Sequence, residues 1–335
     1  MLETLEVYIV GMPIWGLLIV IALALAAIGK GADLLVEEAV TLSRQMGVSK
    51  VLIGATVVSL GTTLPEVTVS VMSAINGNPE LALGNAVGSI ICDTGLILGL
   101  AIFFGRVPIE RSLVNRQGYV QLLAGVLLVV CCLPFSHLSS VFQTGGRLPQ
   151  TLGFVFLALL AGYLWMSVRW ASSDAEEPQA DTGEKASIAM VSVKIILGLT
   201  LVILSSDILI PAVEETARRA HVPDAVIAAT LVAFGTSLPE LVTAITAVRK
   251  GHGELAIGNV IGADILNVLF VAGAAAAVTP LGLVAGPNFF KVLFPAMLLI
   301  LLLFRVALFA SKEALPKWAG FALLGSYGAY LLLSF

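Results

Sequence analysis

Acidic residues stand inside long apolar stretches of this chain, and they are the first candidates for chemistry. A carboxylate at membrane depth costs roughly 2.5–3.5 kcal/mol even on insertion scales. Such a group therefore normally faces a water-filled cavity or binds a cation. The acids in apolar stretches are Asp33, Glu66, Asp93, Asp207, Glu240 and Asp264.

Glu66 and Glu240 are the strongest candidates for cation ligands. Each follows a Gly-Thr-Thr-Leu-Pro or Gly-Thr-Ser-Leu-Pro sequence in the middle of an apolar stretch. A proline inside a helix lacks the backbone N–H and frees carbonyl oxygens in the preceding turn. A hard cation such as Ca2+ takes roughly 6–8 oxygen ligands. Nearby hydroxyls can add oxygens to this cage, from Thr62, Thr63, Thr236 and Ser237. The alternative is a plain proline kink with a structurally bonded glutamate.

A second polar segment follows each glutamate. It begins with Gly-Asn and carries Asp93 in the first case and Asn267 at the equivalent place in the second. Asp93 stands four residues after Ser89, so the two side chains share a helical face. We expect Asp93 to be the third carboxylate of the site. Asn85 and Asn259 remain open between capping, packing and binding, and the glycines of these segments permit close helix packing.

Three other acids are more ambiguous. Asp264 is a candidate ligand, a candidate partner for Lys30, or a group that supports a ligand. Asp33 and Asp207 lie nearer the ends of their apolar stretches, and we expect structural pairing for both.

These residues recur because the chain contains an internal repeat. The segment Ala55–Glu66 recurs as Ala229–Glu240, and Glu80–Gly88 recurs as Glu254–Gly262. Every pair is offset by 174 positions without an insertion. The chain therefore consists of two homologous halves.

The composition places both halves in a membrane. Of the 335 residues, 58% are hydrophobic and only 12% are charged, with a mean hydropathy of +1.01. Soluble proteins carry about 25% charged residues. Apolar runs of about 20 residues recur along the chain, and they are apolar on all sides rather than alternating, which indicates helices and not a barrel.

The apolar runs predict an all-α integral membrane protein with ten spans. Two inverted five-helix repeats, residues 1–170 and 188–335, flank an acidic linker at 171–187, because five spans per half is an odd number. Spans 2 and 7 are broken at their prolines, and spans 1 and 6 are unusually long. The predicted spans are 10–41, 51–75, 80–104, 118–136, 150–170, 188–212, 223–248, 254–278, 288–310 and 316–334.

The basic residues favour one orientation. With the N-terminus outside, most Lys and Arg fall on the inner side, and the outer side receives Arg147, Arg218, Arg219 and Lys291. This positive-inside bias predicts both termini outside and the linker in the cytoplasm. We interpret the linker as a solvated hinge, with a regulatory cation site as the alternative. Its shortness suggests a prokaryotic plasma (inner) membrane.

Neither cysteine nor histidine indicates a cofactor or an enzyme. The three cysteines include the adjacent pair Cys131 and Cys132 and show no disulfide or zinc spacing. His137, His221 and His252 lie near predicted loops. We expect a transporter without a cofactor, functional as a monomer in the lipid bilayer and without a nucleic-acid partner.

The two motifs resemble those of the cation/Ca2+ exchanger superfamily, and specifically its Na+/Ca2+ exchanger branch. The resemblance covers both repeats and effectively the whole chain. It implies that Glu66 and Glu240 share Ca2+ with the backbone carbonyls of Thr62 and Thr236. It implies an inner Na+ site at Ser59, Thr62, Thr63 and Ser89. It implies an outer Na+ site that includes Ala233, Thr236 and Ser237. It also implies alternating access, in which spans 1 and 6 slide against an eight-helix core.

The chain departs from the family pattern at two places. The family often carries Asn in the third span and Asp or Asn in the eighth, whereas this chain has Asp93 and Asn267. Ala263 replaces a serine whose hydroxyl belongs to the outer Na+ site. The Na+ stoichiometry and the identity of the coupling ion are therefore open.

Several rival functions remain to be weighed. Clustered carboxylates could bind protons, which would make the protein an H+/Ca2+ exchanger. The Val87-Gly88-Ser89 sequence argues against this, because H+-coupled relatives carry Gly-Asn-Ala-x-Glu-His there. A K+-dependent Na+/Ca2+ exchanger stays open because of Asp93. A passive channel and an intramembrane aspartyl protease, using Asp33 and Asp207, are the remaining alternatives.

Overall fold

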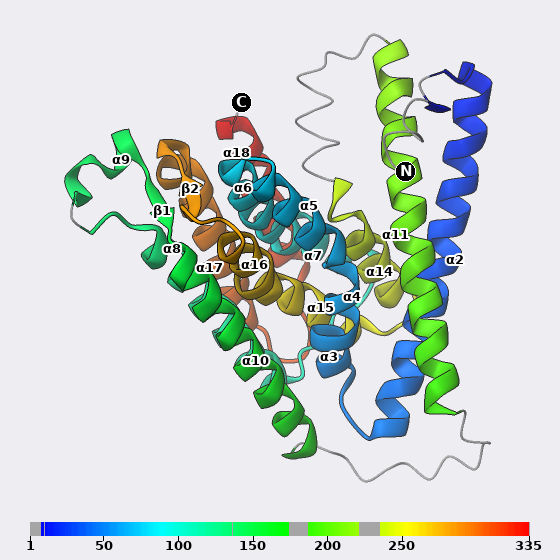
Figure 1. Cartoon of the computed structure of the whole chain (residues 1–335). Coiled ribbons are helices and arrows are strands. Elements are labelled where there is room, and N and C mark those ends of the chain that lie inside the picture. The colour runs from blue at the N-terminus through cyan, green and yellow to red at the C-terminus, as the bar shows by residue number, and fades with distance from the viewer. Residues whose placement is uncertain (1–7, 10, 136, 174–186, 221–234, 335) are drawn as a thin grey trace.

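The chain is almost entirely helical. The computed structural model describes residues 8–9, 11–135, 137–173, 187–220 and 235–334 (Figure 1). Within these residues the structure agrees with the all-helical prediction, apart from two three-residue strands.

The first half contains, in order, α2 (Ile14–Met46), α3 (Lys50–Ile53), η1 (Gly54–Val58), α4 (Ser59–Thr62), α5 (Leu64–Ile75), α6 (Pro79–Ile90), η2 (Ile91–Ile97), α7 (Leu98–Phe104), α8 (Arg111–Cys132), η3 (Leu138–Ser140), α9 (Val141–Thr144) and α10 (Gln150–Ser173). The segments η1 and η2 are π-helical. Such wider turns frequently occur at functional sites.

The second half contains α11 (Ile188–Arg219), α14 (Leu238–Arg249), α15 (Gly253–Leu266), η5 (Asn267–Ala272), α16 (Gly273–Ala277), η6 (Phe289–Leu293), α17 (Phe294–Ala310) and α18 (Lys317–Ser334). Its elements mirror those of the first half. Helices α5 and α14 both have 12 residues, and each begins two residues before its glutamate. A π-helical segment follows α15, as it follows α6.

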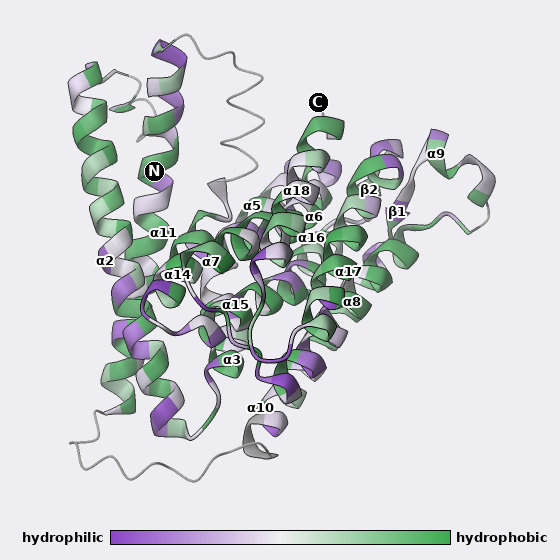
Figure 2. Cartoon of the chain, turned by 180° about the vertical axis from the view of Figure 1, so that it is seen from behind, coloured by the Kyte–Doolittle hydropathy of each residue, from purple (hydrophilic) through white to green (hydrophobic). Residues whose placement is uncertain are grey.

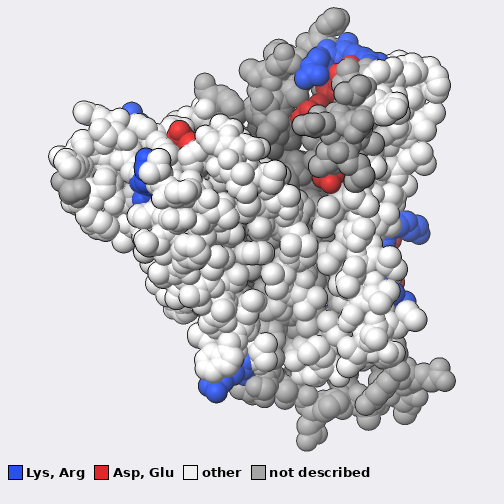
Figure 3. Space-filling model, viewed as in Figure 1, with Lys and Arg blue, Asp and Glu red and all other residues white. Residues whose placement is uncertain are grey.

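Seven described helices, or eight with one bent pair, are long and apolar enough to cross a membrane. Hydrophobic residues make up most of their length (Figure 2). A broad face over the middle of the molecule carries no charged side chain (Figure 3). The structure therefore supports an integral membrane protein, whereas the count of ten spans remains a prediction.

The predicted break in the second span is present. The segment Lys50–Thr62 and helix α5 meet at Thr63 with a bend of 44°. The break in the seventh span is only partly visible, because residues 221–234 lie outside the described residues. Its second part, α14, begins at Leu238 with Pro239 in its first turn, as α5 begins with Pro65.

Two long helices lie side by side at one edge of the molecule (Figure 1). These are α2 and α11, of 33 and 32 residues, which confirms that the first and sixth helices are long. Glycines allow their close approach, since a Cβ on Gly198 would lie 2.9 Å from the Leu35 nitrogen and 3.0 Å from the Gly31 oxygen. Lys194 of α11 also forms an ion pair of 2.7 Å with Glu38 of α2.

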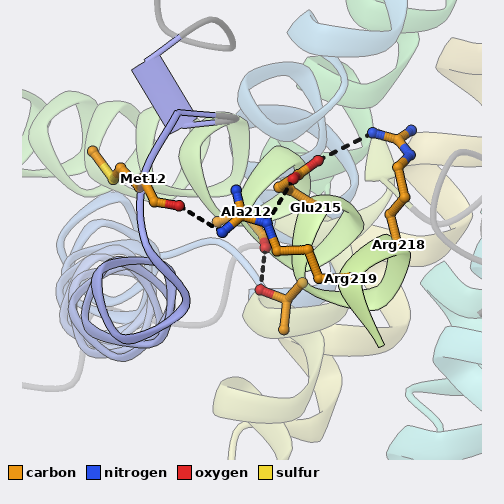
Figure 4. A network of polar contacts seen from close by, with 6 residues as sticks. Met12, Ala212, Glu215, Arg218 and Arg219 are labelled. Carbon is orange, nitrogen blue, oxygen red and sulfur yellow. Dashed lines mark hydrogen bonds and ion pairs between the residues drawn. The ribbon is translucent and has the colours of Figure 1, made fainter. Parts of the chain in front are cut away.

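Polar contacts hold this helix pair together at one level and join α2 to α14 at another. Near the start of α2, Arg219 donates to the Met12 carbonyl and to Glu215, and Arg218 pairs with Glu215 from the other side (Figure 4). Lower down, Lys250, at the end of α14, bridges Asp33 and Glu37 of α2 at 2.9 and 2.6 Å. Asp33 therefore has the structural partner that the sequence predicted for it.

Helix α15 lies at the centre of the larger helix group. It forms one continuous span with η5 and α16. In the most apolar stretch of this span 89% of the residues are buried, whereas the corresponding share for α10 is 22%. Glycines let the first half pack directly on it. A Cβ on Gly262 would lie 2.5 Å from the Ala55 Cα and 2.6 Å from the Ser59 Oγ. Gly258 and Gly262 thus have the packing role that was predicted for them, whereas a Cβ on Gly88, the counterpart of Gly262 in the first half, would meet nothing within 4 Å among the described residues.

A small ribbon joins the two halves at one end of the molecule. Strands β1 (Gly146–Leu148) and β2 (Leu283–Ala285) pair antiparallel, with Arg147 opposite Val284. No strand was predicted here, because three residues are too few to show an alternating pattern.

Helix α8 begins at Arg111, seven residues earlier than its predicted span, and Arg111 donates to the Ser311 carbonyl.

The contact at Gly262 makes a testable prediction. Gly262→Ala should destabilise the protein by about 1–3 kcal/mol, because overpacking against a neighbouring backbone forces a shift. The control is Gly162→Ala on α10, where an added Cβ meets nothing within 4 Å among the described residues. Thermal unfolding in detergent measures both variants. An equal midpoint for the two variants would contradict the proposed close contact.

Candidate functional site

The two proline-broken helices place their glutamates in equivalent positions. Glu66 and Glu240 each lie in the first turn of a helix, α5 and α14 respectively, and each is 1% exposed. The first turn of a helix has unpaired N–H groups and a partial positive charge, which favours a carboxylate there. The local sequence thus places each acid where a buried negative charge is best tolerated.

The halves contact each other reciprocally beside these glutamates. The Thr62 hydroxyl lies 3.5 Å from the Asn259 side-chain oxygen, and the Thr236 hydroxyl lies 3.4 Å from that of Asn85. Each contact joins the broken helix of one half to the Gly-Asn segment of the other. Two distant parts of the repeat therefore make the same contact twice, once in each direction.

Each glutamate also faces hydroxyl groups of the opposite half. Thr62 and Thr63 lie next to Glu240, and Thr236 lies next to Glu66. The two glutamates are close enough to repel each other electrostatically. The two half-sites therefore form one shared centre.

Many oxygens at this centre have no hydrogen-bond partner among the described residues. A buried polar atom without a partner is costly, and such atoms are rare in native proteins. Cation binding would satisfy acceptors of this kind. The unpartnered oxygens are Thr63 Oγ1, Glu66 Oε2, Ser237 Oγ and both carboxylate oxygens of Glu240.

Asp93 lies beside its own repeat partner. Asn267 Nδ2 is 3.4 Å from Asp93 Oδ2, and the two residues are 174 positions apart. A residue that contacts its own counterpart in the other repeat lies where the two halves meet. Asp93 also repels Glu240 electrostatically, and Ser237 lies next to it. Asp93 thus adjoins the glutamate centre, as predicted.

Three carboxylate, imidazole or thiol groups do not converge tightly enough to hold one metal ion anywhere in the described part of the chain. A cation held by Glu66 and Glu240 would therefore draw its other ligands from hydroxyl and carbonyl oxygens. The predicted oxygen cage and the role of Asp93 as a direct ligand both stay predictions.

The remaining predicted residues have different outcomes. Ser59 and Ser89 are buried, and Ser59 Oγ contacts the Thr56 carbonyl at 3.4 Å. Ala233 lies outside the described residues. Asn85 donates to Ser70 at 3.0 Å and to the Glu66 carbonyl at 3.3 Å. Of the three roles left open for Asn85, these contacts favour packing of α6 against α5.

The structure also identifies residues that sequence reasoning missed. Asp264 accepts hydrogen bonds from Thr94 and Gln121. Lys30 is exposed and is not among these partners, so the Lys30 pairing considered for Asp264 is wrong. The available signal was a pair of glutamines, Gln117 and Gln121, one turn apart in an otherwise apolar segment.

The aspartates required by the protease alternative are not juxtaposed. Asp33 lies near the level at which α2 contacts Gly198. Asp207 stands nine residues further along α11, which corresponds to roughly 13 Å at 1.5 Å per residue. Two such aspartates cannot share a proton. The structure therefore gives the protease reading no support.

Comparison with known proteins gives concordant results. The family model for sodium/calcium exchanger protein matches residues 16–169 and 191–335. The chain is 29% identical over 345 residues to sodium/calcium exchanger MaX1 of Methanosarcina acetivorans, covering 95% of this chain and 98% of that protein. It is 31% identical over 311 residues to inner membrane protein YrbG of Escherichia coli, covering 90% and 91%.

A solved structure is similar over nearly the full length. The sodium-calcium exchanger NCX_Mj, soaked with 10 mM Na+ and zero Ca2+, matches with a TM-score of 0.78 and 27% identity. The match covers 96% of this chain and 99% of that chain.

The reciprocal threonine contacts lead to a matched prediction. Thr62→Val and Thr236→Val should each lower the apparent Ca2+ affinity by a similar factor, roughly 2- to 10-fold, because each removes one polar contact. Ca2+-dependent thermal stabilisation of the purified protein measures this effect. Thr144→Val, at an exposed loop helix, is the control. If only one of the two variants lost Ca2+ affinity, the two halves would not contribute equally to the centre.

Proposed function

This chain belongs to the sodium/calcium exchanger family, in the Na+/Ca2+ exchanger branch of the cation/Ca2+ exchanger superfamily, and we propose that it exchanges Ca2+ for Na+ at the Glu66–Glu240 centre. The observation that carries this proposal is the pair of buried glutamates with unpartnered oxygens in the first turns of the equivalent helices α5 and α14. The family is one of transporters, so no catalytic residue is assigned.

The proposed coupling rests on competition for one negative charge. Ca2+ or Na+ ions neutralise the glutamates, so the two kinds of ion bind alternately. An empty centre carries uncompensated charge in a low-dielectric interior and does not pass readily between its inward- and outward-open states. An occupied centre can change its orientation. The Na+ gradient then drives Ca2+ in the opposite direction without another energy source.

The neutral ligands in this proposal come from both halves. Thr62 and Thr236 contribute carbonyl and hydroxyl oxygens, and Thr63, Ser237, Ser59 and Ser89 complete the Na+ positions. Asp93 and Asn267 stand between the two half-sites. The proximity of Thr62 and Thr63 to the glutamate of the opposite half supports this arrangement.

The moving part in this proposal is the pair α2 and α11. The two helices pack closely on each other through glycines and the Lys194–Glu38 ion pair. They lie side by side at one edge of the molecule in Figure 1, with Lys250 at the end of α14 paired to Asp33 of α2. Sliding this pair past the core would open the centre to one side and then to the other.

We further propose ten spans in two inverted repeats, 1–170 and 188–335, with both termini outside a plasma membrane and the 171–187 linker in the cytoplasm. Labelling of single cysteines from either side tests this orientation in a background without native cysteines. A cysteine at Thr144 should react from outside and one at Lys312 from inside. The reverse pattern would invert the assignment.

A flux assay tests the proposed exchange directly. Vesicles with reconstituted protein should take up radiolabelled Ca2+ when loaded with Na+, but not when loaded with choline. Glu66→Gln and Glu240→Gln should each reduce uptake to background, because the centre then lacks charge to hold a divalent ion. The Glu313→Gln control removes a carboxylate that is 81% exposed and paired with Arg106, and should leave uptake intact.

Three outcomes would contradict this assignment. Uptake driven by a pH gradient alone would identify H+/Ca2+ exchange. A requirement for K+ together with Na+ would identify the K+-dependent reaction. Ca2+ flux that is independent of any counter-ion gradient would indicate a channel.

A further inference from the structure

Arg305, near the end of α17, is a buried guanidinium without a counter-charge among the described residues. It is 4% exposed, although an arginine stays protonated and a buried charge normally has an ionic partner. Arg305 forms no ion pair with any described residue. Its Nη1 donates to the Asn115 carbonyl of α8 at 3.4 Å, whereas its Nε and Nη2 have no hydrogen-bond partner in the described part of the chain. The positive charge therefore calls for an anion that these residues do not supply.

The two unpartnered nitrogens of Arg305 form one edge of its planar guanidinium. Along that edge two N–H groups point in the same direction, which matches two oxygens of a carboxylate or a phosphate. The guanidinium carbon lies 3.7 Å from the centre of the Tyr119 ring and 4.6 Å from that of Phe309. A Cβ on Gly118 would lie 3.0 Å from Nη1, so the glycine leaves room for the guanidinium. Neighbouring residues thus hold the group in place and leave its bidentate edge without an acceptor.

A second arginine lies at the same helix seam, which we define as the contact between the start of α8 and the end of α17. Arg111 stands one helical turn before Asn115 and donates to the Ser311 carbonyl at 3.0 Å. Like Arg305, it forms no ion pair among the described residues. Glu313, which lies just beyond α17, pairs with Arg106 instead. An anion at the seam would therefore be attracted by two guanidinium groups.

The seam faces the lipid near the end of a span. On each of its helices the exposed apolar side chains recur three or four positions apart and form one stripe. The stripes include Tyr119, Leu123 and Val126 of α8 and Leu302, Val306 and Phe309 of α17. Arg305 stands five residues before the end of the 22-residue span Phe289–Ala310, which is roughly 8 Å along the helix axis. A hydrocarbon core of about 30 Å widens to about 40–45 Å with the headgroups, so Arg305 lies close to the headgroup level.

We propose that the Nε–Nη2 edge of Arg305 binds the phosphate of an anionic glycerophospholipid, whose acyl chains lie along the apolar stripes of α8 and α17. Tyr119 and Phe309 are 49% and 62% exposed, and surface side chains change rotamer readily, so a phosphate can reach the edge that their rings cover. A lipid fits this place better than a free anion, because the approach to the edge is apolar on both helices. Basic pockets between transmembrane helices on the cytoplasmic side bind anionic headgroups, and the proposed orientation puts the seam on that side.

Thermal unfolding of the whole protein in mixed micelles tests this binding. Phosphatidylglycerol should raise the unfolding midpoint above its value in phosphatidylcholine at the same lipid-to-detergent ratio, because a ligand of the folded state stabilises that state. In Arg305→Met, which keeps an apolar stem without the charge, this difference should disappear. Arg305→Lys keeps the charge but loses the bidentate edge, so it should need more phosphatidylglycerol for the same rise.

Arg106→Met is the matched control. It removes one positive charge from an arginine whose side chain is 66% exposed, and it should keep the full response to phosphatidylglycerol. Equal midpoints of the wild-type protein in the two lipids would overturn the proposal, as would an Arg305→Met protein that still responds. The same rise with glycerol phosphate in phosphatidylcholine micelles would overturn it too, because the occupant would then be a free anion.

A second measurement on the wild-type protein does not depend on the folding of a variant. Native mass spectrometry after incubation with an equimolar mixture of the two lipids should show bound phosphatidylglycerol in preference to phosphatidylcholine. Equal retention of both lipids would contradict a phosphate site that selects for negative charge. Neither readout uses ion exchange, so a failure of this lipid site and a failure of the proposed exchange are distinguishable.

Discussion

The structure depends on uncompensated negative charge buried in an apolar interior. Glu66 and Glu240 are both 1% exposed, and no ion pair of the described residues reaches either of them. Burial of such groups is tolerated only with compensation. Helix N-termini and nearby hydroxyl groups supply part of it, and in the proposed function a bound cation supplies the rest. A centre that needs an ion to be stable is well suited to exchanging one ion for another.

The internal repeat explains how the chain builds such a centre. Each half alone provides one broken helix and one Gly-Asn segment. The contacts Thr62–Asn259 and Thr236–Asn85 show that each half completes the other. Close packing makes this possible, because Gly262 lets the first broken helix approach the backbone of α15. The Asp93–Asn267 contact lies where the two halves meet, so one carboxylate there faces both half-sites.

Much of this was predictable from sequence, for identifiable reasons. Glu66 and Glu240 were identified because a carboxylate beside a proline in an apolar segment is costly to bury. The long helices α2 and α11 were identified from the length of their apolar segments. Sequence could not predict the Gln121–Asp264 contact, because it joins residues 143 positions apart and depends on how α8 packs on α15. It also missed the first turns of α8, whose polar residues, such as Arg111, are stabilised by a distant loop. The sequence shows which buried side chains are costly in free energy, but it does not show which distant residues stabilise them.

The central claim is that Ca2+ and Na+ compensate the same buried charge. Equilibrium binding of radiolabelled Ca2+ to the purified protein, measured at increasing Na+ with choline maintaining the ionic strength, tests it most directly. The account predicts that Na+ raises the apparent Ca2+ dissociation constant without limit and leaves the number of Ca2+ sites unchanged, as competition requires. A dissociation constant that reaches a plateau, with both ions bound together, would contradict a single shared centre.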